Sequence, residues 1–162
     1  MSSSGRVVVG MASAAGVSYG VRALEALRDA SAEIHLVMTG ASEEALATDL
    51  ERVRSLSDHV YAEENQAAPI SSGSFLTRGM IVAPCDGAGL AAITLGLATN
   101  LVFRAADVTL KERRPLVLGL VASRPTAIEK AHLARAAEVP GLRVVRLDGP
   151  SDEAVARLLE HL

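Results

Sequence analysis

The sequence predicts an α/β fold in three layers, a doubly wound parallel sheet with helices on both of its faces. Short runs of β-branched and aliphatic residues alternate along the chain with stretches whose apolar residues recur at helical spacing. These short runs are apolar at nearly every position, which is typical of strands that are covered on both faces. Right-handed crossovers through the helices then place successive strands side by side.

The first half of the chain contains two strand and helix units. Residues 6–11 are almost all apolar, and after several small residues a helix is expected at residues 17–30. A second strand is expected at residues 33–38. It leads into residues 42–56, which have the pattern of an amphipathic helix with Ser42 as its N-cap.

The middle of the chain begins with a loop. Residues 61–74 are polar and contain Pro69 and a run of small residues, so we expect an irregular segment that can carry a site. A strand at residues 79–83 follows, closed by a Pro-Cys pair. Residues 86–97 are rich in glycine and alanine and are expected to form a helix.

The second half continues the alternation of helix and strand. Residues 101–113 have a helical pattern, and residues 115–121 form the next apolar strand. A helix that opens on a proline is expected at residues 125–137, since proline suits the first helical turn. A last strand at residues 142–147 precedes a terminal helix at residues 151–162, whose cap is the run Ser-Asp-Glu.

Length and composition indicate a single domain spanning residues 1–162. The chain has 162 residues, of which 49% are hydrophobic, enough for one full core. The net charge of −3, the absence of a basic cluster and an aromatic content of 2% argue against binding of nucleic acid. We expect no nucleic-acid partner.

The expected compartment is the cytoplasm. The single cysteine, Cys85, excludes a framework of disulfides within the chain. The N-terminal residues lack the pattern of a signal peptide, and no apolar run approaches the roughly 20 residues of a membrane span. We therefore expect no membrane span. Part of the apolar surface is expected to be buried between subunits of a homo-oligomer.

Candidate ligand-binding residues follow the expected strands. In a doubly wound sheet, ligands bind beyond the carboxyl ends of the strands, so the loops after Met11, Met38 and Ala83 should converge. Ser13 and the small residues after it place backbone N–H groups at a helix N-terminus, which favours a phosphate. The alternative is that these small residues merely let helix and strand pack closely. Thr39 adds a hydroxyl to the same anion or is an ordinary turn residue.

Other polar residues have structural explanations of similar weight. Asp86 stands where a carboxylate caps a helix, and Cys85 is more typical of a small buried residue than of a nucleophile. The histidines have no spacing of the kind His-x-x-x-His, so we expect no metal site. The charged run at residues 111–114 closes a helix, where cations are favoured, and predicts a solvated or intersubunit cluster.

Several stretches together resemble the UbiX-type flavoproteins, relatives of the homo-oligomeric flavin-containing cysteine decarboxylases. The similarity covers residues 5 to about 120 well and the remainder loosely. It rests on Val-Gly at residues 9–10 with Gly16, Tyr-Gly-Val-Arg at residues 19–22, His-Leu-Val-Met-Thr at residues 35–39, Ile-Ser-Ser-Gly-Ser-Phe at residues 70–75, Pro-Cys at residues 84–85 and Arg-Ala-Ala-Asp-Val-Thr-Leu-Lys-Glu-Arg-Arg-Pro-Leu-Val-Leu at residues 104–118.

This resemblance implies a flavodoxin-like or Rossmann-like sheet, FMN held at subunit interfaces, and a large homo-oligomer built from trimers, commonly a dodecamer. UbiX-type members transfer a dimethylallyl group from dimethylallyl phosphate to reduced FMN, and UbiD-type decarboxylases use the prenylated flavin. The implied flavin contacts are Ser13, Ala14, Ala15, Thr39, Asp86, Gly87, Ala88, Gly89 and Arg104. Lys111, together with Arg157, is the implied ligand of the prenyl donor's phosphate.

The sequence departs from the family pattern at its catalytic positions. A serine, a glutamate and an Arg-Glu pair of the family correspond here to Ala15, Ala47, Val121 and Ala122, and a late tyrosine has no counterpart. Where the family has a Ser-x-Lys-Thr type loop, this chain has Asp86 and three small residues. Three functions therefore remain open: a flavin prenyltransferase-like enzyme, a carrier or storage protein for flavin, and an FMN-dependent redox or decarboxylating enzyme with a different substrate.

Overall fold

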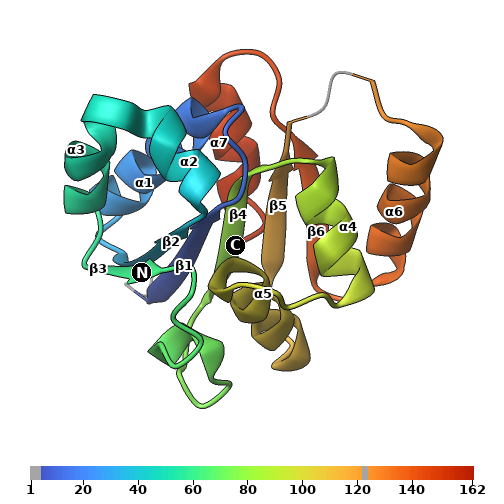
Figure 1. Cartoon of the computed structure of the whole chain (residues 1–162), viewed down its shortest axis with the longest axis horizontal. Coiled ribbons are helices and arrows are strands. Elements are labelled where there is room, and N and C mark those ends of the chain that lie inside the picture. Colours follow the sequence, from blue (N-terminus) through green and yellow to red (C-terminus); the bar gives the residue numbers. More distant parts are fainter. Residues whose placement is uncertain (1–4, 122–123) are drawn as a thin grey trace.

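The computed structural model describes residues 5–121 and 124–162 as one α/β unit built on a six-stranded sheet (Figure 1). The strand order is β3-β2-β1-β4-β5-β6, and neighbouring strands are parallel throughout. The strands are β1 (Arg6–Met11), β2 (Glu33–Met38), β3 (His59–Ala62), β4 (Gly79–Cys85), β5 (Leu116–Leu120) and β6 (Leu142–Arg146). The predicted doubly wound α/β fold is confirmed.

Helices cover both faces of this sheet. The helices are α1 (Val17–Asp29), α2 (Gly40–Leu46), α3 (Leu50–Ser55), α4 (Gly87–Leu95), α5 (Leu101–Lys111), α6 (Ala127–Glu138) and α7 (Ser151–Leu159). Helices α1, α2, α3 and α7 contribute to the core on one face, and α4, α5 and α6 contribute to the core on the other. None of the helices in residues 5–121 and 124–162 has the length and apolar character needed to cross a membrane.

The apolar runs of the sequence reflect these two cores. In β1, Val7, Val9 and Met11 face one core while Val8 faces the other, and all four side chains are at most 2% exposed. Burial on both faces therefore requires apolar residues at consecutive positions. The chain turns from one half of the sheet to the other between β1 and β4, which is where a doubly wound sheet offers a ligand site.

The strand predictions were accurate except at one edge. The predicted strands at residues 6–11 and 33–38 coincide with β1 and β2, and β4 runs two residues beyond the predicted end, to Cys85. The edge strand β3 was missed, because His59–Ala62 is short and largely exposed and so has no apolar run. Part of it lies in the segment predicted to be a loop.

The helix predicted at residues 42–56 is wrong in its continuity and in its cap. The segment divides into α2, a 3-10 turn at Ala47–Asp49, and α3. The N-cap is Thr39 and not Ser42, since the Thr39 side chain accepts a hydrogen bond from the Ser42 N–H. Helix α2 ends because Ala47 has a φ of +49°, which places it outside the right-handed helical region.

Two predicted helix starts and the predicted surroundings of Arg114 need correction. Helix α6 begins at Ala127 with Thr126 as its N-cap, where Thr126 and Glu129 form a capping box. Helix α7 is preceded by Pro150, and no side chain of the predicted Ser-Asp-Glu cap accepts a capping hydrogen bond. Arg114, expected in a solvated or intersubunit cluster, donates to the Phe75 and Gly73 carbonyls at 2.8 Å each and so fastens the loop before β4.

The break at Ala47 predicts opposite effects for two glycine substitutions. Ala45→Gly, at an exposed position inside α2, should lower the free energy of unfolding by about 1 kcal/mol, because glycine disfavours a helix. Ala47→Gly should leave stability unchanged or raise it, because glycine adopts positive φ without the penalty that alanine incurs. Thermal unfolding of the two variants beside the parent checks this, and an equal loss in both would indicate a continuous helix.

Candidate active site

The loops after β1, β2 and β4 meet at the carboxyl ends of the strands, as predicted. The Ala12 N–H donates to the Pro84 carbonyl at 2.9 Å, which joins the start of the first loop to the end of β4. The Thr39 N–H donates to the Met11 carbonyl at 3.0 Å, which joins the start of the second loop to the end of β1. Backbone hydrogen bonds therefore hold the starts of the first two loops against the carboxyl ends of the neighbouring strands.

Three hydroxyl residues, Ser13, Thr39 and Ser42, lie together where the first two loops meet, and we call them the hydroxyl cluster. The Ser42 hydroxyl donates to the Ser13 carbonyl at 3.1 Å and lies 3.0 Å from the Thr39 hydroxyl. Ser42 is fully buried and Ser13 nearly so, whereas Thr39 is half-buried. Ser13 and Thr39 were predicted to converge. Ser42, which links them, was read from the sequence only as a helix cap.

The N-terminus of α1 is open to an anion. Its N-cap is Gly16, whose φ of +81° suits glycine, and no side chain caps this helix. The first turn contains no acidic residue, and Ala14 and Ala15 before it are exposed. Since the first N–H groups of a helix carry partial positive charge, this end favours a negatively charged ligand.

The small residues of this region also serve close packing. A Cβ at position 20 would collide with the Met11 side chain and with the Ala83 carbonyl oxygen, and a Cβ at position 16 would lie 2.6 Å from a Val121 methyl group. Helix α1 therefore approaches β1 and β4 more closely than any side chain at position 20 would permit. The two explanations that the sequence left open, packing and ligand binding, apply here together.

The N-terminus of α4 has the opposite electrostatic character. Asp86 is its N-cap and accepts a hydrogen bond from the Gly89 N–H at 2.9 Å, which confirms its predicted capping role. The Glu129 carboxylate of α6 lies against Gly87, so closely that a Cβ there would collide with it. Two carboxylates thus surround this helix end and disfavour a phosphate there. Sequence reasoning missed Glu129, because only the fold brings α6 to this loop.

Cys85, at the end of β4, lies beside the site without taking part in it. Its side chain is fully buried, and a Cβ at Gly89 would lie 2.8 Å from its sulfur. Burial, with a smaller contribution from the charge of Asp86, raises the pKa of the Cys85 thiol well above its usual range. The thiol therefore stays protonated and is not a nucleophile, as the sequence suggested.

Arg104 and Lys111 both lie on α5, Arg104 one turn from its start and Lys111 at its end. Arg104 is half-exposed and forms an ion pair with Asp107 at 3.7 Å, one turn along the same helix. Lys111 is 67% exposed and pairs with Glu112 at 3.6 Å. The start of α5 is anchored after β3 by a hydrogen bond from the Leu101 N–H to the Glu63 carbonyl, so Lys111 lies about 15 Å farther along the helix axis.

The substituted positions bring no acid or base to the loops. Ala15 and Ala47 are exposed, and Val121 is half-buried against Gly16, whereas Ala122 lies outside the described residues. Arg157 donates to the Asp148 carboxylate at 2.9 Å and to the Arg146 carbonyl at 3.0 Å, so part of its hydrogen-bonding capacity is already used.

A hollow of about 400 Å³ lies at the ends of β2 and β3, next to Thr39. Gly40, Tyr61 and Glu63 are among the residues that line it.

Comparisons of the sequence with known proteins agree on one family. The family model described as Flavoprotein matches residues 1–155. Flavin prenyltransferase UbiX of Escherichia coli K12 is 43% identical over an alignment covering 96% of this chain and 90% of that protein. The corresponding enzyme of Neisseria meningitidis is 40% identical over 96% and 88%. A probable UbiX-like flavin prenyltransferase of Bacillus subtilis is 46% identical over 79% of this chain, and the aligned part is only 63% of that longer protein.

Solved structures give the same result for the fold. A dodecameric FMN-dependent UbiX-like decarboxylase from E. coli O157:H7 superposes with a TM-score of 0.90 at 36% identity, covering 96% of this chain and 92% of that chain. AnUbiX in complex with FMN and dimethylallyl pyrophosphate gives a TM-score of 0.86 at 38% identity, covering 96% and 90%. The cysteine decarboxylase TvaF is similar in fold, with a TM-score of 0.74 at 16% identity.

The capping role of Asp86 predicts different effects for two substitutions. Asp86→Ala removes the acceptor of the Gly89 N–H and should lower the free energy of unfolding by about 1 kcal/mol. Asp86→Asn keeps an oxygen acceptor at the same place and should cost much less. Chemical denaturation of both variants measures the difference. Equal losses in the two would show that the charge of Asp86, and not its hydrogen bond, stabilises the start of α4.

Proposed function

This chain belongs to the flavoprotein family that includes the UbiX-type flavin prenyltransferases, and from that premise we propose that it binds FMN across the loops after β1, β2 and β4. The observation that carries the proposal is the hydroxyl cluster, which lies where the loops after β1 and β2 meet, beside the uncapped N-terminus of α1. Hydroxyl groups and free N–H groups in this arrangement suit a phosphorylated ligand.

The charges around the two helix ends orient the proposed FMN. Its phosphate belongs at the N-terminus of α1, where Ser13, Ala14 and Ala15 supply the loop and Thr39 a hydroxyl group. The segment from Asp86 to Gly89 is assigned to the uncharged part of the cofactor, since its carboxylate accepts hydrogen bonds but repels a phosphate. FMN supplies a flavin ring that accepts electrons and, when reduced, a nucleophilic ring.

Arg104 and Lys111 are assigned to the site of a neighbouring subunit. Arg104 is half-exposed and Lys111 is exposed, and their ion pairs with Asp107 and Glu112 are surface pairs, which contribute little to stability. The E. coli O157:H7 relative is a dodecamer, and we infer a homo-oligomer built from trimers for this chain as well. In such an assembly Arg104 contacts the flavin and Lys111 binds the phosphate of dimethylallyl phosphate, with α5 reaching across the interface.

The proposed reaction is transfer of a dimethylallyl group from dimethylallyl phosphate to reduced FMN. We expect its rate to be well below that of the UbiX-type relatives. Ala15, Ala47 and Val121 have no atom that transfers a proton, and Arg157 is held by Asp148. Loss of one acid or base typically costs about 10²- to 10⁴-fold in rate, and several losses together leave little of the chemistry.

The same observations favour a second candidate function, that of a flavin carrier. A protein that keeps the loops, the hydroxyl cluster and the α1 N-terminus, but lacks the proton-transferring groups, can bind FMN or prenylated FMN and deliver it unchanged. The two candidates agree on the cofactor and differ only in turnover.

One experiment tests both candidates. The purified protein is examined for bound flavin by its visible spectrum, incubated with reduced FMN and dimethylallyl phosphate, and the extracted flavin is analysed by mass spectrometry. We expect bound FMN and very slow formation of prenylated flavin. The double variant Ala15→Ser/Ala47→Glu, which restores a hydroxyl and a carboxylate, should form the product at least about tenfold faster.

The matched control is Ala45→Glu, which adds a carboxylate at an exposed position of α2 only two residues from Ala47. It should leave the rate at the parent level. If the parent formed prenylated flavin as fast as the E. coli enzyme assayed beside it, that result would refute the proposed loss of rate. Bound FMN with no product from the parent or the double variant would favour the carrier, and failure to bind any flavin would refute the site.

A further inference from the structure

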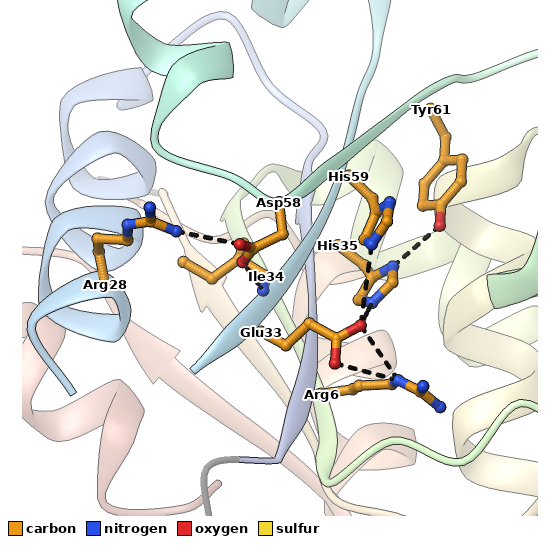
Figure 2. A network of polar contacts seen from close by, with 8 residues as sticks. All are labelled: Arg6, Arg28, Glu33, Ile34, His35, Asp58, His59 and Tyr61. Atoms are coloured by element: carbon orange, nitrogen blue, oxygen red, sulfur yellow. Dashed lines mark hydrogen bonds and ion pairs between the residues drawn. The ribbon is translucent and has the colours of Figure 1, made fainter. Parts of the chain in front are cut away.

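Glu33, His35 and His59 form a cluster of potential metal ligands (Figure 2). Glu33 is the first residue of β2, whereas the proposed FMN loops follow the ends of the strands. Glu33 and His35 are two residues apart on β2, so their side chains leave the same face of the sheet. His59 on β3 is directly opposite His35 in the strand register. The fold thus brings two imidazoles and one carboxylate together at the edge of the sheet.

The ligand atoms of these residues have the separations of a metal site. The Glu33 Oε1 lies 3.0 Å from the His35 Nε2 and 3.8 Å from the His59 Nε2, and all three atoms lie within 4.8 Å of one another. In a tetrahedral site with bonds of 2.0 to 2.2 Å, ligand atoms are about 3.4 Å apart. Only small movements are needed to reach that geometry.

The main movement is a rotation of the His59 ring. The rings of His35 and His59 are stacked, with their centroids 4.6 Å apart and their planes 16° from parallel. Stacked rings do not direct both lone pairs at one ion. The side chain of His59 is 53% exposed, however, so solvent leaves it room to turn while His35 stays in place.

The surroundings hold His35 as a metal ligand requires. Its Nδ1 is 2.9 Å from the Tyr61 hydroxyl, and its ring packs against Phe75 in a T-shaped pair with the ring centroids 5.0 Å apart. Such an outer hydrogen bond fixes the ring orientation and the tautomer of a ligating histidine. Two neighbours thus hold the His35 ring, and burial lowers the pKa of its imidazole.

The carboxylate of Glu33 is positioned as well. The Arg6 Nε donates to its two oxygens at 3.2 and 3.3 Å, and His35 holds Oε1 from the other side. Hydrogen bonding to His35, together with Arg6, lowers the pKa of Glu33. When Oε1 binds an ion, Oε2 still has Arg6 as its partner.

We propose that Glu33, His35 and His59 bind one divalent ion of the Zn²⁺, Co²⁺ or Ni²⁺ class, with water in the remaining position, and that the ion links β2 to the edge strand β3. Two imidazoles and one carboxylate are the ligands that such ions prefer. The criterion of His-x-x-x-His spacing does not detect this set, since it applies to helices, whereas these ligands come from adjacent strands. The proposal does not depend on flavin binding.

The test is a titration of the purified, untagged protein with Co²⁺, followed by visible absorption. We expect one ion per chain, a tetrahedral Co²⁺ spectrum and displacement by Zn²⁺. The variants His59→Gln and Glu33→Gln should each weaken Co²⁺ binding at least about tenfold. The control His161→Gln, at an exposed histidine near the C-terminus, should bind as the parent does. His35 is left intact because its side chain is buried.

The variants also separate this proposal from nonspecific binding. Their flavin content and far-ultraviolet circular dichroism should match the parent, since the substituted side chains are partly or largely exposed. Absence of Co²⁺ binding in the parent, or binding that persists unchanged in His59→Gln and Glu33→Gln, would overturn the proposal.

Discussion

Helix α1 lies so close to the sheet that position 20 has no room for a Cβ, and the geometry of the proposed flavin site follows from that contact. A side chain there would collide with Met11 of β1 and with the Ala83 carbonyl of β4. The order in which successive strands are added to the sheet reverses between these two parallel strands. With α1 in this place, its N-terminus stands over the carboxyl ends of both strands. The hydrogen bonds from Ala12 to Pro84 and from Ser42 to Ser13 then fix the surrounding loops.

Charge decides which of the neighbouring helix ends receives an anion. The first turn of α1 has no acidic residue, whereas α4 begins between the carboxylates of Asp86 and Glu129. Arg104 and Lys111, which the family resemblance assigns to the flavin and to the phosphate of the prenyl donor, lie on α5 in surface ion pairs. We therefore propose that the phosphate of a bound flavin lies at α1 and that a neighbouring subunit supplies the cations.

Most of the strands could be predicted from the sequence, because burial on both faces of a parallel sheet leaves uninterrupted apolar runs such as residues 6–11. The strand β3 left no such trace, since it lies exposed at the edge. The positive φ of Ala47 was equally hidden, because alanine is the best helix former and indicates continuity. Ser13 and Thr39 were predicted through the rule that ligands bind beyond strand ends, and the structure brings the two residues together through Ser42. Glu129 and the cross-strand pair of His35 and His59 depend on contacts between distant segments, which spacing does not encode.

The most direct test of the central claim is a crystal structure of the FMN complex. The account predicts the phosphate at the N-terminus of α1, within hydrogen-bonding distance of the N–H groups of the first loop and of the Thr39 hydroxyl. It also predicts Arg104 of a neighbouring subunit against the flavin. A phosphate bound at the N-terminus of α4, between Asp86 and Glu129, would contradict the account.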